Sequence, residues 1–473
     1  MSLNMTNLGL YTDMYELTMA QGYYLTGKAE VPACFDYFFR SNPFEGGYVV
    51  FAGLQDLIDC IKDFRFDKDA CRYLLDLGFA SKFVEFLAVF NFRGEISAPK
   101  EGEIVFPFEP VMEVKGNLLE LQLIETLLLN IINFQSLIAT KAARMRCVAG
   151  ERSLVDFGLR RAQSWGGLQA ARAAVIGGFN ATSNVYAGKM YELPCSGTQA
   201  HSWIQSFENE LTAFRKFAAI YPENCILLVD TYDTLYSGVP NAVKVAKEME
   251  AEGHKLKGIR LDSGDLSYFS KKSRNILDKA GLEYVKIIAS NHLDEYLIRS
   301  LNIQKAPLDG FGVGTRLVTG KPDAALDGVF KLSMSDGKPR LKLSENVAKI
   351  LFPGEKKVYR FFNGEGFFYG DAVLLESEKE TTVMHHPQER EKFCSLKKMK
   401  YEPLLKTVMK KGQQITSKTP VSEIASYKCQ RLSMLPDEHK RFENPHIYKV
   451  GLSERLMKLR NKMIHDAQRK QNL

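Results

Sequence analysis

The apolar positions in the first part of this chain follow two different periods, and this mixture predicts an α+β domain. Residues 33–39 and 47–51 are aromatic-rich apolar runs typical of strands, whereas residues 54–64 repeat apolar positions at helical spacing. Short apolar segments that Pro and Gly interrupt between residues 92 and 114 predict a small twisted sheet. Residues 118–134 are apolar on all sides, which predicts a helix buried on several faces.

From about Glu151 the pattern changes to short apolar runs, each followed by a glycine or polar turn and an amphipathic helix. Units of this kind are typical of a parallel α/β barrel or of a doubly wound sheet. In both architectures the reactive groups gather at the carboxyl ends of the strands. The predicted strands are 154–157, 179–182, 191–194, 226–229, 258–261, 285–289 and 310–313.

After Thr319 the alternation ends, and a smaller mixed region is expected. The apolar runs 329–333 and 339–343 flank Asp336-Gly337-Lys338, which predicts a hairpin, and residues 453–469 predict a basic amphipathic helix. We therefore expect a mixed N-terminal domain at 1–140, an α/β domain with the active site at 141–330, and a basic mixed region at 331–473 that packs on the others.

The composition of the chain is typical of an ordinary cytoplasmic enzyme. Of the 473 residues, 45% are hydrophobic and 25% are charged, which is close to the globular average, and no apolar run reaches the roughly 18 residues that span a bilayer. The N-terminus lacks a secretory signal, and the eight cysteines form no C-x-x-C pair, which argues against a zinc knuckle and a disulfide framework. A net charge of +7 is too mild for nucleic-acid binding but suits anionic small molecules.

The residues just after the predicted strands form a polar set that suits phosphates and sugar hydroxyls. Arginines bind phosphate or carboxylate through two parallel hydrogen bonds, glycine loops expose backbone N–H groups, and aspartates accept from ribose hydroxyls or hold magnesium. Simpler interpretations stay open, because Arg161 suits a surface ion pair, Asp265 a helix N-cap and the glycines a tight turn. The set comprises Arg160 and Arg161, Gly197 to Ser202, Asp230 to Asp233, Asp262 to Asp265, Ser290 and Asn291, and Gly312 to Arg316.

The segment Cys195 to Ser202 places a histidine among small and hydroxyl residues. Such a loop lets an anion approach the backbone, and the histidine is a candidate nucleophile or acid/base. The alternative for His201 is a hydrogen-bonded structural residue near a helix N-terminus.

Taken together, five motifs in this order resemble those of nicotinate phosphoribosyltransferases: residues 12–16, 156–161, 197–202, 259–265 and 312–315. The resemblance covers nearly the whole chain and implies an irregular α/β barrel of the type II phosphoribosyltransferase kind, fused to a mixed N-terminal domain. It also implies the transfer of phosphoribosyl from 5-phosphoribosyl 1-diphosphate to nicotinate in NAD salvage, coupled to ATP hydrolysis. Mg²⁺ is then expected on the substrate diphosphate, with no dedicated metal ligands from the protein.

The resemblance also assigns roles to single residues. His201 corresponds to the residue that ATP phosphorylates, Thr198 and Arg260 to nicotinate contacts, and Thr315 to a phosphoribosyl diphosphate contact. Tyr15 corresponds to a ring that stacks on the pyridine in a neighbouring subunit, opposite Phe157, which implies a homodimer. The predicted catalytic residues are His201, Arg260 and Asp262, and the predicted substrate contacts are Tyr15, Phe157, Arg160, Ser183, Thr198, Asp230, Ser263, Gly264, Gly312, Gly314 and Thr315.

Ser183 favours nicotinate over nicotinamide as the substrate. Relatives that use nicotinamide tend to carry an aspartate there, which would accept from the amide and repel a carboxylate. The alternatives are a nicotinamide or quinolinate phosphoribosyltransferase, or a non-catalytic relative that binds nucleotides.

Overall fold

The computed structural model describes residues 7–342, 352–389 and 391–471, and the chain forms two compact units. The second unit comprises 138–324 and 420–425, and the first comprises the rest. Most of the chain after residue 325 therefore belongs to the same compact unit as the N-terminal region.

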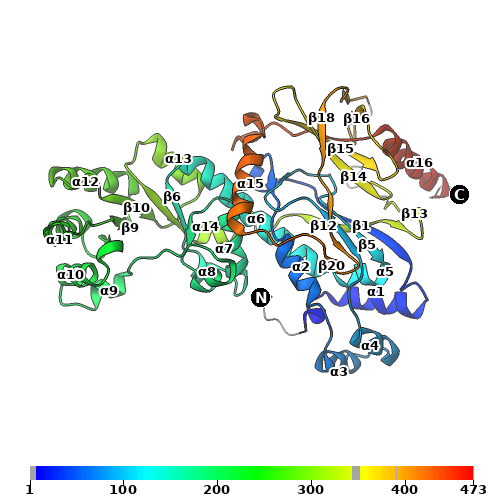
Figure 1. Cartoon of the computed structure of the whole chain (residues 1–473), viewed down its shortest axis with the longest axis horizontal. Helices are drawn as coiled ribbons and strands as arrows, with labels where there is room; N and C mark the ends of the chain where they lie inside the picture. Colours follow the sequence, from blue (N-terminus) through cyan, green and yellow to red (C-terminus); the bar gives the residue numbers. More distant parts are fainter. Residues whose placement is uncertain (1–6, 343–351, 390, 472–473) are drawn as a thin grey trace. The chain divides into compact units, whose positions relative to one another are not determined.

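The first unit contains a seven-stranded sheet built from both ends of the chain (Figure 1). Its order is β13-β12-β1-β5-β3-β19-β20, in which β1 (Pro32–Phe39) pairs antiparallel with β12 (Gly328–Ser335) and β5 (Met112–Asn117). On the other side of β5, β3 (Glu95–Ala98) pairs with β19 (Lys406–Lys410). The predicted strand at 33–39 is therefore confirmed as a central strand of this sheet.

The predicted hairpin after β12 is also confirmed. Ser335 pairs with Lys338, and Asp336 and Gly337 have φ angles of 54° and 65°. Two left-handed residues make the type I′ turn that matches the twist of paired strands. The second strand, β13 (Lys338–Pro339), is shorter than expected, and residue 343 lies outside the described residues.

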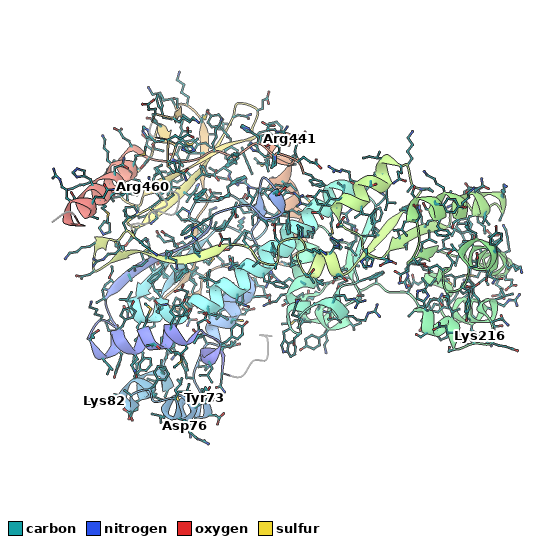
Figure 2. All side chains as sticks on the ribbon, turned by 180° about the vertical axis from the view of Figure 1, so that it is seen from behind. Tyr73, Asp76, Lys82, Lys216, Arg441 and Arg460 are labelled. Carbon is teal, nitrogen blue, oxygen red and sulfur yellow. The ribbon has the colours of Figure 1, made fainter. Side chains whose placement is uncertain are left out.

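The remaining elements of the first unit include a second sheet, six-stranded, of order β17-β16-β21-β15-β14-β18. Figure 2 shows Tyr73, Asp76 and Lys82 at the outer end of the helical pair α3 and α4. The elements are α1 (Met14–Leu25), β2 (Val49–Val50), α2 (Leu54–Lys62), α3 (Lys68–Asp76), α4 (Ser81–Ala88), β4 (Ile104–Val105), α5 (Leu118–Leu123), α6 (Glu125–Ala149, shared with the second unit), β14 (Lys356–Phe362), β15 (Phe368–Leu375), β16 (Val383–His385), β17 (Phe393–Ser395), β18 (Lys400–Pro403), β20 (Gln413–Gln414), α15 (Val421–Ser433, also shared), β21 (Val450–Leu452) and α16 (Glu454–Gln471).

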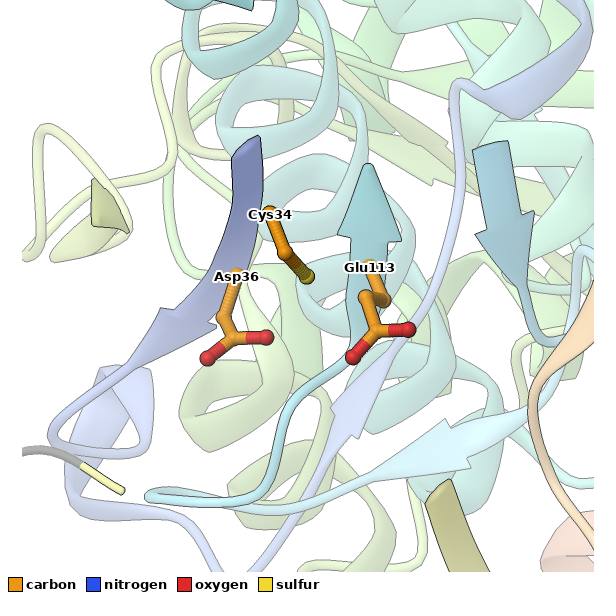
Figure 3. A group of neighbouring side chains, drawn as sticks. All are labelled: Cys34, Asp36 and Glu113. Carbon is orange, nitrogen blue, oxygen red and sulfur yellow. The ribbon is translucent and has the colours of Figure 1, made fainter. Parts of the chain in front are cut away.

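A buried ionic cluster lies on one face of β1 and β5. Figure 3 shows Cys34, Asp36 and Glu113, whose ligand-type atoms all lie within 4.8 Å of one another. The Lys356 ammonium lies 2.9 Å from Asp36, and Lys115 lies 2.9 Å from Glu113. Because the two ammonium groups already balance the two carboxylates, the cluster is an ion-pair network.

The second unit is built on a six-stranded parallel sheet of order β7-β6-β11-β10-β9-β8. The last strand, β11 (Gly310–Val313), pairs with the first, β6 (Ser153–Asp156), and the other strands follow one another in chain order on either side. This cyclic order is that of a barrel and not of a doubly wound sheet. The sheet is an incomplete barrel, since β7 (Ala181–Thr182) and β8 (Ile226–Leu228) are its two edges.

The strand predicted at 191–194 is wrong. Residues up to Tyr191 belong to α8 (Val185–Tyr191), which ends at Glu192 with a left-handed φ of 56°. Leu193 N–H donates to the Gly188 carbonyl, as at a capped helix end. The extended backbone comes later, where Cys195 forms an isolated parallel bridge with Thr182.

Helices follow the other strands of this unit as expected, and no helix of the described residues is long and apolar enough to cross a membrane. The further elements are α7 (Gly166–Ile176), α9 (His201–Gln205), α10 (Glu210–Ile220), a π-helical turn (Thr234–Gly238), α11 (Val239–Ala251), β9 (Gly258–Leu261), α12 (Leu266–Lys279), β10 (Lys286–Ser290), α13 (Glu295–Ile303) and α14 (Thr315–Val318).

Candidate active site

His201 stands at the start of α9 and contacts residues from two other strand ends. Its Nδ1 lies 3.0 Å from the Thr231 hydroxyl, just beyond β8, and its Nε2 lies 3.8 Å from the Asp262 carboxylate, just beyond β9. The His201 and Asp262 side chains keep 41% and 36% of their surface exposed. A hydroxyl therefore hydrogen-bonds one nitrogen of an imidazole that solutes can reach, and a carboxylate lies near the other nitrogen.

Asp230 links the ends of β8 and β9. One of its carboxylate oxygens accepts from the Asp262 N–H at 2.8 Å and from the Ser263 hydroxyl at 2.7 Å, whereas the other is buried with no partner in the described part of the chain. Asp262 itself accepts from the Ser290 hydroxyl at the end of β10. The two aspartates are thus held in place while keeping oxygen atoms that a ligand can use.

Arg260 supplies a half-buried cation beside an aromatic ring. Its guanidinium carbon lies 5.8 Å from the centre of the Phe157 ring, and one of its N–H groups donates to the Gln199 carbonyl at 3.0 Å. Burial lowers the pKa of Arg260, and the nearby carboxylates of Asp262 and Asp230 oppose this shift. Its Nε is buried without a partner among the described residues, so it remains a free donor for an anionic group.

Gly312 provides the space for the Phe157 ring. A Cβ on Gly312 would lie 2.3 Å from an atom of this ring, and the Phe157 N–H donates to the Val313 carbonyl at 2.8 Å. Gly312, which lies in one of the predicted phosphate loops, therefore makes room for a ring that follows the neighbouring strand β6.

Asp156 is a buried residue of the site that sequence reasoning did not select. Its carboxylate accepts from the Thr182 hydroxyl and from the Gly158 N–H, both at 2.8 Å, and its backbone carbonyl accepts from the Ser183 N–H. Burial raises the pKa of Asp156, and these hydrogen bonds oppose the rise. Asp156 joins the ends of β6 and β7. An acidic residue directly before Phe157 at a strand end was the available signal.

The other predicted residues divide by position. Asp265 is the N-cap of α12 and accepts from the Tyr268 N–H at 2.8 Å, which confirms the capping interpretation. Tyr15 belongs to α1 of the first unit, where its side chain is 50% exposed. The strand-end segments of the second unit carry Phe157, Arg160, Ser183, Thr198, His201, Asp230, Arg260, Asp262, Ser263, Gly264, Gly312, Gly314 and Thr315.

Comparison with known proteins gives consistent matches along the chain. The family model of nicotinate phosphoribosyltransferases matches residues 152–348, and the models of their N-terminal and C-terminal domains match residues 10–133 and 355–460. The nicotinate phosphoribosyltransferase of Bacillus subtilis is 43% identical, covering 98% of this chain and 96% of the relative.

Solved structures agree with these matches. Human nicotinic acid phosphoribosyltransferase is similar with a TM-score of 0.87 at 31% identity, over 95% of this chain and 99% of that one. The nicotinate-nucleotide pyrophosphorylase of Pyrococcus furiosus shares the fold, with a TM-score of 0.72 at 24% identity, over 91% of this chain and 98% of that one.

Proposed function

The chain belongs to the nicotinate phosphoribosyltransferase family, and we propose that it transfers phosphoribosyl from 5-phosphoribosyl 1-diphosphate to nicotinate. The products are nicotinate mononucleotide, a precursor of NAD, and diphosphate. The observation that carries the proposal is the convergence of His201, Asp262 and Arg260 at the carboxyl ends of one parallel sheet.

Arg260 and Phe157 form the nicotinate pocket in this proposal. The pyridine ring packs against Phe157, and the nicotinate carboxylate pairs with the half-buried Arg260 guanidinium, whose Nε lacks a partner in the described residues. Thr198 lies next to Gln199, the backbone partner of Arg260, and adds a hydroxyl. Ser183 places no negative charge in this region, which favours the acid over the amide.

The phosphoribosyl diphosphate contacts come from the polar strand ends. Asp230 and Asp262 offer oxygens to ribose hydroxyls, and the unpartnered buried oxygen of Asp230 also fits a hard cation such as Mg²⁺. Mg²⁺ bound to the diphosphate supplies charge neutralisation as this group leaves. The other phosphate and ribose contacts that we propose are Arg160, Ser263, Gly264, Gly314 and Thr315, whereas Gly312 acts on the nicotinate pocket through the Phe157 ring.

The transfer step requires the protein to orient the two substrates but not to remove a proton. The pyridine nitrogen attacks C1 of the ribose with its own lone pair, and the bond from C1 to the diphosphate oxygen breaks. Arg260 and Phe157 fix the ring so that its nitrogen faces C1. No general base is required, which leaves His201 free for another role.

We assign His201 the role of phosphoryl acceptor from ATP. Asp262 and Thr231 orient its imidazole, and a phosphoryl group on this ring changes the charge of the diphosphate pocket between the steps of turnover. Tyr15 on α1 has half of its surface exposed, which supports the expectation that it reaches the pocket of a second copy in a homodimer. The eight free cysteines support a cytoplasmic location.

The direct test is a product assay with labelled nicotinate, 5-phosphoribosyl 1-diphosphate, Mg²⁺ and ATP. We expect labelled mononucleotide, with much slower formation from nicotinamide or quinolinate. The His201→Ala variant should retain slow transfer but lose ATP-coupled turnover and acid-labile enzyme-bound phosphate. An unchanged ATP-coupled rate in this variant contradicts the assignment of His201, and failure of the native enzyme to form mononucleotide contradicts the proposed reaction.

A further inference from the structure

A buried carboxylate in the second unit, that of Glu210, has no role in the chemistry described so far. Glu210 begins α10 and is 4% exposed. Its Oε2 accepts from the Ser237 hydroxyl and from the Asn241 side-chain amide, the latter at 2.9 Å. Ser237 belongs to the π-helical turn and Asn241 to the first turn of α11, so these hydrogen bonds link the turn and α11 to α10.

The π-helical turn begins at Thr234, three residues after Thr231, the hydroxyl partner of His201. Asp233 begins the turn and accepts from the Leu235 and Tyr236 N–H groups at 3.0 and 2.7 Å. At its end, a Cβ on Gly238 would lie 1.8 Å from the Val229 carbonyl, so the turn packs directly against the end of β8. A displacement of the turn therefore moves Thr231, whereas the Asp262 N–H and the Ser263 hydroxyl keep Asp230 in place.

The same helix, α10, also holds the segment that carries His201. Trp203, two residues after His201, donates its indole N–H to the Ala213 carbonyl of α10 at 3.2 Å. Its ring centre lies 5.9 Å from that of Phe217. Lys216 lies on the exposed face of α10, where Figure 2 labels it, whereas Ala213 and Glu210 are buried.

Three hydrogen bonds connect these segments in a closed ring. His201 is hydrogen-bonded to Thr231, and Ser237 of the turn after Thr231 donates to Glu210 of α10. Trp203 of α9 donates to Ala213 of α10, and α9 begins at His201. A cavity of about 500 Å³ adjoins Glu210 and is also lined by Glu208, Tyr232, Ser237 and Asn241. Without the Glu210 carboxylate, Ser237 and Asn241 lose their shared acceptor and have room to move.

We infer that Glu210 is a positioning residue, which fixes Thr231 opposite His201 and so controls the phosphorylation of His201. The inference rests on the proposed function. In that step an imidazole nitrogen forms a bond to the γ-phosphorus of ATP, the bond from this phosphorus to the bridging oxygen breaks, and ADP leaves with the electron pair. The reaction requires the ring to present one nitrogen in line with the breaking bond, and the His201–Thr231 contact sets that orientation.

The test compares Glu210→Ala and Glu210→Gln with Glu208→Ala as the matched control, since Glu208 lines the same cavity but is exposed. We expect Glu210→Ala to slow the formation of acid-labile phosphoenzyme about tenfold or more, while ATP-independent transfer stays within about twofold. Glu210→Gln keeps an acceptor oxygen, so its rate of phosphoenzyme formation should lie between those of Glu210→Ala and the native enzyme. Glu208→Ala should form phosphoenzyme at the native rate.

Two outcomes overturn the inference. One is an unchanged phosphorylation rate in Glu210→Ala, and the other is an equal fall of phosphorylation and transfer that merely follows the fraction of folded protein. If the native enzyme forms no phosphoenzyme, the proposed role of His201 fails, but the positioning claim is still decided by ¹⁵N NMR. The His201 imidazole signals should shift in Glu210→Ala and not in Glu208→Ala, and identical signals in both variants contradict the claim.

Discussion

Replacing Gly312 with alanine should impair nicotinate binding through the Phe157 ring. The added Cβ would lie 2.3 Å and 2.4 Å from two carbons of that ring, whereas ordinary contacts begin at 3.4 Å. The ring must therefore retreat by about 1 Å, and misplacements of this size cost catalysis roughly a hundredfold. The Val313 carbonyl holds the Phe157 backbone, so the ring has to turn away from its observed position.

The assay is steady-state kinetics with each substrate varied in turn. We expect kcat/KM for nicotinate to fall by about 30- to 100-fold, with a change of less than about threefold in KM for 5-phosphoribosyl 1-diphosphate. Gly310→Ala is the control on the same strand, because its nearest contact, the Ser153 Cβ at 3.2 Å, requires only a small adjustment.

A second substitution separates the clash from other effects. Phe157→Leu removes the ring and loses the stacking, so adding Gly312→Ala to this variant should cost less than it does in the native enzyme. The reasoning is refuted if Gly312→Ala leaves the nicotinate kinetics unchanged, or if the two substitutions are fully additive.

Three further predictions test other parts of the molecule. Ser183→Asp should shift the ratio of nicotinate to nicotinamide turnover towards the amide by about tenfold or more, because a second carboxylate repels the acid, and an unaltered ratio counts against the pocket assignment. Asp265→Ala removes the N-cap of α12 and should lower the free energy of unfolding by about 1 kcal/mol. Chemical denaturation measures this loss, with Glu283→Ala in the exposed turn after α12 as the control. Burial raises the pKa of Asp36 from 3.8 to about 7, so the folded state holds this proton more tightly than the unfolded state. The stability of the native protein relative to Asp36→Asn should therefore be highest below about pH 4 and fall as the pH rises to 7, by at most about 1.4 kcal/mol per pH unit. A difference that does not vary between pH 4 and pH 7 would show that folding leaves the pKa of Asp36 close to its ordinary value.

The sequence predicted the strands of the second unit well because their signals are local. Apolar runs such as 226–229 and 258–261 are bounded by polar turns, and the structure places β8 and β9 there. The segment 191–194 misled because Tyr-Glu-Leu-Pro alternates like a strand, while the left-handed Glu192 that ends α8 leaves no local trace.

The pairing of strands that lie far apart in the chain could not be predicted from the sequence. Nothing around Ala33 indicates that it pairs with Ser335, since the two residues share only the general preference of apolar runs for strands. The candidate site shows the same limit. His201 and Asp262 could be selected by residue type, but the role of Thr231 depends on its 3.0 Å contact, and the role of Gly312 depends on a ring from another strand.

The seven-stranded sheet of the first unit has a consequence for synthesis on the ribosome. Its strand β1 leaves the ribosome almost 300 residues before its partner β12, which at about 5–20 residues per second is a delay of roughly 15–60 s. During that interval one edge of β1, rich in aromatic residues, has no native neighbour, whereas the sheet of the second unit is complete within one continuous stretch of chain. The nascent chain therefore presents this edge early and covers it late, so the edge is open to non-native strand pairing during synthesis.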